Sequence, residues 1–168
     1  MNQIYTHPKR KTKVVFVQLG SPTEPTTKAL RKYLRKFLGD PRVVDINPWL
    51  WKIILNFFVL PFRPKKSAKL YARIWDGKSF PLITNTRDFT NNVREELKKI
   101  DPDGYVEVNH AFLLSPPYVN EVYDSWEDDL KKGIGATKLL VIPMFPQYSE
   151  STIASGIDAL AKELSKRV

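Results

Sequence analysis

A continuous apolar run, followed by a polar motif and then a helix pattern, constrains this chain more than any other feature. Residues 138–142 (KLLVI) are typical of a strand buried on both faces of a parallel sheet. The motif at residues 143–152 comes next, and residues 153–164 then place apolar side chains at helical spacing. The motif therefore lies between the carboxyl end of a strand and the start of a helix. Open α/β sheets bind ligands at that position, and the free N–H groups of a helix start favour anions.

The rest of the chain repeats this alternation of strand and helix patterns. We expect strands at residues 13–19, 105–113 and 138–145. We expect helices at residues 26–38, 48–60, 65–74, 84–100, 118–132 and 152–167. Strands that alternate with helices predict an α/β fold with a doubly wound parallel sheet. The sequence predicts a single domain over residues 13–168, preceded by a flexible basic tail at residues 1–12.

Composition limits the classes of function. With 168 residues, 42% of them hydrophobic, the chain can bury one ordinary core. It has no cysteine, which excludes disulfides and thiolate metal sites and suits a cytoplasmic location. The net charge of +9 favours anionic partners such as a carboxylate-bearing ligand or acidic lipid, although a solvated basic surface explains it equally well. Because no nucleic-acid motif accompanies the charge, nucleic acid is not an expected partner.

Residues 47–62 form an unusual apolar segment with two tryptophans. It is too short to span a bilayer, and Lys52 and Asn56 interrupt it. Its apolar side chains lie nearly all round a helix, which is typical of a buried helix. The alternatives are an exposed apolar lip over a ligand pocket and a patch that rests on a membrane surface. An exposed patch could also drive self-association with a second copy of the chain.

Four blocks, in order, carry a resemblance to a known family. They are residues 17–22 (VQLGSP), 33–45 (YLRKFLGDPRVVD), 60–75 (LPFRPKKSAKLYARIW) and 146–152 (PQYSEST). Together they resemble the ferrochelatases, which insert ferrous iron into a porphyrin to make haem. The resemblance implies a flavodoxin-like, chelatase-like domain. It also implies that the apolar segment is a lip at the porphyrin pocket, beside which several members of the family contact membranes.

The resemblance marks three substrate-binding residues around the third block. Arg63, Tyr71 and Ser79 match positions that contact porphyrin in the family. A guanidinium at residue 63 could hold a porphyrin propionate through two parallel hydrogen bonds. From the residues alone, a surface arginine at the start of a basic helix is favoured at this position. The tyrosine offers a flat ring with a hydroxyl at its tip, which suits the edge of a macrocycle.

The motif after the last strand supplies three more candidates: Phe145, Tyr148 and Ser149. The two aromatic rings fit either the pocket wall or the core. The Ser149 hydroxyl could face a ligand, and one of Ser149, Ser151 and Thr152 is expected to cap the following helix.

The chain also departs from the family pattern. Phe112, Leu113 and Leu114 stand where the family has Arg-Tyr-Gly, so two polar residues of the family's pocket are missing. Glu150 stands where some members carry an iron–sulfur cysteine. The isolated His7 and His110 give only a weak metal signal, and we expect neither a metal ligand nor a bound cofactor.

The resemblance covers the N-terminal half of the family, whose catalytic His and Glu belong to the other half. We therefore expect no catalytic residue here and little activity from this chain alone. The parent reaction would insert ferrous iron into protoporphyrin IX or coproporphyrin III. The expected partners are porphyrin, the missing C-terminal half or a second copy, and a membrane surface for a peripheral cytoplasmic protein. The alternatives are a non-catalytic porphyrin- or haem-binding module and a membrane-surface module.

Overall fold

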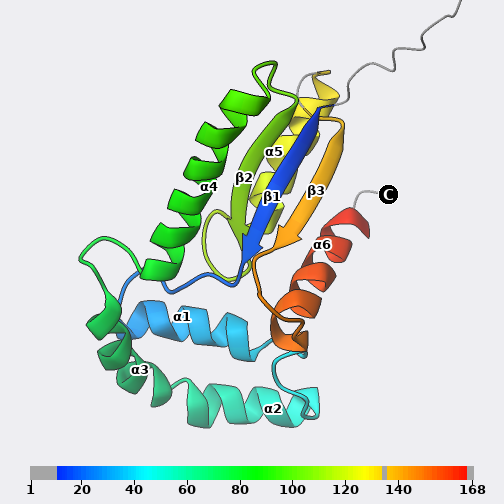
Figure 1. Ribbon diagram of the computed structural model, residues 1–168. Coiled ribbons are helices and arrows are strands. Elements are labelled where there is room, and N and C mark those ends of the chain that lie inside the picture. The colour runs from blue at the N-terminus through cyan, green and yellow to red at the C-terminus, as the bar shows by residue number, and fades with distance from the viewer. Residues whose placement is uncertain (1–10, 134–135, 166–168) are drawn as a thin grey trace, which may run out of the picture.

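The protein is built around a parallel sheet of three strands. The computed structural model describes residues 11–133 and 136–165 (Figure 1). Within them, β1 (Thr12–Gln18) lies at the centre of the sheet. It pairs in parallel with β2 (Val106–Phe112) on one side and with β3 (Lys138–Pro143) on the other. The predicted parallel α/β sheet is thereby confirmed.

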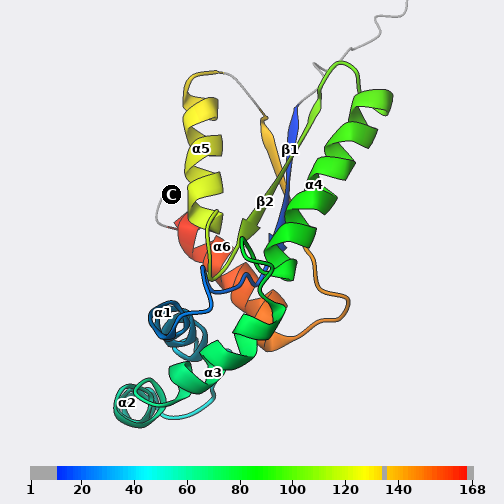
Figure 2. The same cartoon turned by 90° about the vertical axis from the view of Figure 1, so that its left-hand side faces the viewer.

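Helices cover both faces of this sheet because both faces of its central strand are apolar. Helix α4 (Pro81–Ile100) packs on Val14 and Phe16 of β1. Helices α5 (Val119–Lys131) and α6 (Ser155–Ser165) pack on Val15 and Val17, which point the other way. Figure 2, which views the sheet nearly edge-on, shows α4 and α5 on opposite sides. The sheet is doubly wound, as predicted.

A separate group of helices lies beyond the carboxyl ends of the strands (Figure 1). It consists of α1 (Thr27–Leu38), α2 (Pro48–Ile54) with the π-helical turn η1 (Leu55–Val59), and α3 (Arg63–Tyr71) with the short 3-10 helix η2 (Ala72–Ile74). The core between α1 and the segment that contains α2 and η1 consists of Tyr33, Leu34, Leu38, Leu55 and Leu60. These helices place residues 47–62 at the same end of the sheet as the motif that follows β3.

The structure moves several predicted element boundaries. Helix α4 begins at Pro81, three residues before the predicted start, because proline fits the first helical position, where its missing N–H costs nothing. The predicted helix at 152–167 begins as a wide turn, η3 (Glu150–Ala154), and only then continues as α6. The predicted strand at 138–145 ends at Pro143. Strand β1 already includes Thr12, while residues 1–10 of the predicted tail lie outside the described residues.

The apolar segment at residues 47–62, called the lip below, is exposed. Trp49 is 78% exposed, Phe58 67% and Phe62 72%, whereas Leu55 and Leu60 point into the helical core. The interpretation as a buried helix is wrong, because the segment packs on the core along one narrow side only. None of the helices in the described ranges has both the length and the apolar character that crossing a membrane needs.

The two edges of the sheet differ. On β2 the backbone N–H and C=O groups of the even-numbered residues face away from β1. Among them, Val106 N donates a hydrogen bond to Asp101 Oδ2 (2.7 Å). Arg94 Nε donates to the carbonyl oxygen of Val108 (2.7 Å), so side chains cover this edge. On β3 the even-numbered residues bond to β1, as Met144 N does to Val17 O (2.8 Å), and the odd-numbered ones face outward.

Candidate functional site

The turn after β1 brings the carboxyl ends of β1 and β2 together. Gly20 adopts φ +94°, a conformation that side-chain-bearing residues rarely adopt. A Cβ here would collide with the hydroxyl of Ser115, which follows β2. That buried hydroxyl accepts a hydrogen bond from Ser21 N at 3.3 Å. Glycine at residue 20 is therefore required both by the backbone and by its neighbour.

Gln18 joins the ends of β1 and β3 in a similar way. Its Nε2 donates to the carbonyl oxygen of Met144 at 2.9 Å, and its Oε1 accepts from Leu19 N at 3.0 Å. Because the same amide contacts both strands, the motif after β3 leaves the sheet from a fixed point.

Arg63 occupies the first position of α3, directly after the exposed Phe62 of the lip. Its side chain is exposed. Within the described part of the chain, no hydrogen bond or ion pair engages its guanidinium. A planar cation beside an apolar surface can bind a carboxylate of an otherwise apolar ligand through paired hydrogen bonds.

Tyr71, at the end of α3, is half-buried in an aromatic cluster. Its ring centroid lies 6.3 Å from that of Tyr33 and 5.5 Å from that of Phe80. Burial, and then the neighbouring Tyr71, raise the pKa of Tyr33, whose hydroxyl donates to the carbonyl oxygen of Gly20 (3.5 Å). Tyr71 therefore lies next to Tyr33, the side chain that bonds to the turn after β1.

Ser79 lies in the turn before α4. Its backbone N–H donates to Asp76 Oδ1 at 2.6 Å, and hydrogen bonds from Ser79 and Lys78 lower the pKa of that carboxyl. Its own hydroxyl lies 3.5 Å from the carbonyl oxygen of Phe80. The side chain is half-buried.

The motif after β3 forms the wide turn η3. The carbonyl oxygen of Ser149 accepts from the backbone N–H groups of Thr152, Ile153 and Ala154. The Ser149 hydroxyl makes no capping bond to η3 and instead lies 3.0 Å from the hydroxyl of Ser151. The expected side-chain cap is therefore replaced at Ser149 by a backbone carbonyl, which leaves a pair of hydroxyls beside the turn.

The two aromatic candidates of the motif lie in different surroundings. Phe145 lines an apolar hollow of about 250 Å³ between β3 and α6, together with Val141 and Ile153. Tyr148 is exposed. Phe145 thus lies on a pocket wall, and Tyr148 has a free ring face.

The six predicted binding residues form two groups in the fold. Arg63, Tyr71 and Ser79 surround α3, whereas Phe145, Tyr148 and Ser149 follow β3. Both groups lie on elements beyond the carboxyl ends of the strands (Figure 1).

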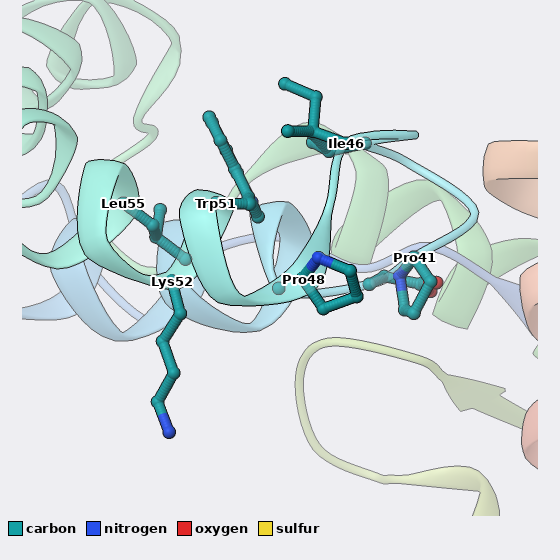
Figure 3. Close-up of a pocket in the computed structure, with 9 residues that line it drawn as sticks. Pro41, Ile46, Pro48, Trp51, Lys52 and Leu55 are labelled. Atoms are coloured by element: carbon teal, nitrogen blue, oxygen red, sulfur yellow. The ribbon is translucent and has the colours of Figure 1, made fainter.

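Sequence reasoning missed a second hollow, of about 210 Å³, under the start of the lip. Figure 3 shows Trp51 and Ile46 on one side of it, whereas the side chain of Lys52 extends the opposite way. Trp51 Nε1 donates to the carbonyl oxygen of Leu38 at 2.6 Å, which fixes the ring against the end of α1. The prolines at residues 41 and 48, which bracket the loop, were the available signal.

Sequence reasoning also missed a bridge between this loop and α6, formed by Asp40, Arg42, Ser155 and Asp158. Arg42 Nε donates to Asp158 Oδ2 at 2.7 Å, and Nη2 donates to Oδ1 at 3.3 Å. The Ser155 hydroxyl donates to Asp40 Oδ2. The hydrogen bond and charge of Asp158 raise the pKa of Arg42, and Glu150 and Tyr148 of the motif add to the effect. Both side chains of the pair remain partly exposed.

The remaining departures from the family pattern have structural roles. Phe112 is fully buried, and Leu114 packs against the core shared by the helices beyond the strands. Leu113 packs on the α5 and α6 side of the sheet. Apolar packing therefore occupies the positions where the family pattern has an arginine and a tyrosine.

His110 has no ligand set around it. Its Nδ1 is buried without a hydrogen-bond partner, and burial lowers the pKa of the ring, with further lowering from Arg94 and Arg87. Across residues 11–133 and 136–165, no three histidine, aspartate or glutamate side chains come together as a metal site would require. His7 lies outside the described residues.

Comparison with known proteins assigns these features to a family. The sequence profile described as Ferrochelatase matches residues 11–168, which is nearly the whole chain. The chain belongs to the ferrochelatase family. The match includes the four blocks on which the resemblance rests.

Individual ferrochelatases match over most of this chain but less than half of their own length. The ferrochelatase of Idiomarina loihiensis is 44% identical over 92% of this chain and 41% of its own length. Those of Teredinibacter turnerae and Actinobacillus pleuropneumoniae are 40% and 38% identical, over 99% and 92% of this chain. The aligned regions are 44% and 46% of those two relatives. The chain thus spans less than half the length of the ferrochelatases it matches.

Proposed function

We propose that this chain supplies the porphyrin-binding half of a ferrochelatase, an enzyme that inserts ferrous iron into protoporphyrin IX or coproporphyrin III. The observation that carries the proposal is the family match over residues 11–168. In this proposal the chain contributes one wall of the porphyrin pocket and a propionate clamp. Metal insertion and proton removal need residues that the family carries outside the matched half, so the chain alone has little or no activity.

The chemistry of the lip supports a flat, apolar, anionic ligand. Exposed rings at Trp49, Phe58 and Phe62 offer apolar surface at the carboxyl end of the sheet. Cationic residues follow this surface directly: Arg63, Lys65, Lys66, Lys69 and Arg73. A porphyrin combines a large apolar face with carboxylates on one edge. The face would lie on the exposed rings of the lip, and the carboxylates would lie beside the cations that follow it.

Each predicted residue has a specific role in the proposal. Arg63 binds a propionate through its exposed guanidinium, and Tyr71 and Ser79 contact the same edge of the macrocycle. Phe145 and Tyr148 offer ring faces for the macrocycle, and Ser149 offers a hydroxyl. No residue of this chain is assigned to catalysis.

The experiment is a titration of the chain with coproporphyrin and with protoporphyrin, followed by the Soret band and by tryptophan fluorescence. We compare the chain with Arg63→Ala and with a control, Lys98→Ala, which removes an exposed cation whose partner is the nearby Glu95. A propionate clamp predicts that Arg63→Ala weakens binding about tenfold to a hundredfold, the range for a charged hydrogen-bond partner. Lys98→Ala should bind like the unchanged chain.

The result separates the proposal from its alternatives. Tight binding that depends on Arg63, without metal insertion by the chain alone, fits both the porphyrin-binding half and the non-catalytic porphyrin-binding module. Adding the rest of a ferrochelatase, fused after residue 168, then distinguishes these two functions through iron insertion. Absence of saturable binding would contradict both.

A second candidate function is contact with a membrane surface, supported by the exposed tryptophan and phenylalanines of the lip beside its cations. Sedimentation with vesicles containing anionic lipid tests it, using Trp49→Ser combined with Phe58→Ser. Both side chains are exposed, so the fold should tolerate the change. Loss of vesicle binding supports the surface function, and unchanged binding contradicts a role for the lip.

A further inference from the structure

The loop between α1 and α2 is a tight structure centred on Asp40. The carbonyl oxygen of Asp40 accepts from Val43 N at 3.0 Å and from Val44 N at 3.2 Å. Its side chain accepts from Arg42 N at 2.8 Å. The loop therefore holds its own shape and presents two side chains, Asp40 and Arg42, in a fixed relation to the start of α2.

Both side chains contact the first turn of α6. Asp40 bonds to the Ser155 hydroxyl, and Arg42 forms the paired hydrogen bonds to Asp158. Ser155 and Asp158 are three residues apart, so they lie on the same face of the helix. Two independent contacts on one face determine the direction of a helix better than either contact alone.

Helix α6 continues directly from η3, which carries the hydroxyl pair of the motif. The Ser149 carbonyl accepts the first hydrogen bonds of η3. At the other end, Ser155 is the residue that directly follows η3. Ser155 is therefore both the end of the turn and a contact of Asp40. The single turn η3 therefore separates the contact of Asp40 at Ser155 from the hydroxyl of Ser149.

We propose that Asp40 and Arg42 are positioning residues, which hold the η3 turn and its Ser149–Ser151 hydroxyl pair in place relative to the lip. The role rests on the proposed porphyrin-binding function, because Ser149 belongs to the proposed site and the lip forms its other side. Neither residue needs to contact the porphyrin. Their effect is to set the separation between the surface after β3 and the surface of α2 and α3.

The contacts suit positioning better than overall stability. An isolated ion pair between partly exposed side chains contributes little to the stability of a fold. Its paired geometry nevertheless fixes the relative orientation of the two groups it joins. Removing it should therefore loosen η3 without unfolding the chain.

The test measures amide hydrogen exchange by NMR in the full chain, without any ligand. In Arg42→Ala and in Asp40→Asn we expect the amides of Thr152, Ile153 and Ala154 to exchange about tenfold faster than in the unchanged chain. The reason is that η3 opens locally more often once it loses a contact with the loop. The melting temperature should stay nearly unchanged. The double variant Arg42→Asp with Asp158→Arg, which restores the pair in reverse, should recover slow exchange.

Arg87→Ala is the matched control, because Arg87 forms a similarly exposed pair with Asp88 on α4. It should leave exchange at η3 unchanged. If Arg87→Ala raises exchange as much as Arg42→Ala does, the effect is one of general surface charge and the proposal is wrong. Unchanged exchange in both Arg42→Ala and Asp40→Asn would equally overturn it.

Porphyrin titration of the same variants then separates this proposal from the proposed function. We expect Arg42→Ala to weaken coproporphyrin binding about fivefold, because the ion pair of Arg42 with Asp158 and the neighbouring η3 turn are energetically coupled. The charge-reversed pair should restore the affinity. Faster exchange with unchanged affinity would overturn the positioning role. If the unchanged chain binds no porphyrin, the proposed function fails, and the exchange data alone decide whether the bridge holds η3.

Discussion

The hydroxyl of Ser115 occupies the space that a side chain at Gly20 would fill. The two residues follow different strands, and their contact brings the carboxyl ends of β1 and β2 together. It also explains why the Gly20 position tolerates no larger residue.

Gly20→Ala should therefore destabilise the chain by more than the cost of placing an alanine in this backbone conformation. The strained φ costs about 1–3 kcal/mol, and the collision with Ser115 adds to it. Gly77→Ala is a close control, since Gly77 has the same φ of 94° but open space around its Cβ. Urea unfolding of both variants gives the difference; equal losses would show that Ser115 yields without cost.

Arg94→Leu should uncover the outer edge of β2. The variant loses the hydrogen bond from the guanidinium to the Val108 carbonyl, and bonds of this charged type contribute about 1.5–3 kcal/mol. We expect lower stability in urea unfolding and a greater tendency to aggregate. Lys99→Leu, on the same helix but in an exposed ion pair with Glu96, should change stability little. Similar losses in the two variants would contradict a specific role at the edge.

Trp51→Phe should weaken the attachment of the lip to α1. The change keeps an aromatic ring but removes the indole N–H that bonds to the Leu38 carbonyl, at a cost of about 0.5–1.5 kcal/mol. Trp49→Phe, at an exposed position without this bond, is the control. Thermal unfolding compares the two variants, and an equal effect would show that the Trp51 bond contributes nothing.

His110 should make the chain less stable as the pH falls. Its pKa in the folded chain lies below the ordinary value of about 6.5, because burial and then Arg94 and Arg87 disfavour the charged ring. Between these two pKa values the unfolded chain binds more protons at His110 than the folded chain does. The contribution of His110 to the stability of the fold is therefore complete above the ordinary pKa and declines as the pH falls below it. His110→Phe should reduce the loss of melting temperature between pH 7 and 5. An identical pH profile in the variant would show that His110 does not titrate as inferred.

The sequence predicted the central strand well because β1 is buried on both faces. The prediction that residues 138–142 are buried in the same way is wrong, because β3 lies at an edge of the sheet and exposes Leu140 and Ile142. Continuous apolar runs such as Val14 to Val17 have few alternatives to a central parallel strand. The exposure of the lip could not be predicted from pattern, since apolar residues lie nearly all round it. Contacts with α1, such as those of Leu55, Leu60 and Trp51, decide which side is buried.

The place of the motif after β3 could be predicted from the sequence for a similar reason. A motif that directly follows a strand has a defined place, and Phe145 and Ser149 lie where their position in the chain indicates. The bridge from Arg42 to Asp158 joins residues 116 positions apart. Neither residue belongs to a local pattern that marks the pairing, so only the folded chain shows it.

The two edges of the sheet differ in how readily a further strand could pair with them. Side chains of Arg94 and Asp101 occupy two of the outward-facing backbone groups of β2, the Val108 carbonyl and the Val106 N–H. On β3, Leu139 and Val141 turn their amides outward, and the neighbouring Leu140 and Ile142 are 44% and 36% exposed. Pro143 has no N–H to offer, so pairing would stop where β3 ends. An additional strand, from whatever polypeptide, would therefore meet fewer occupied backbone groups beside β3 than beside β2.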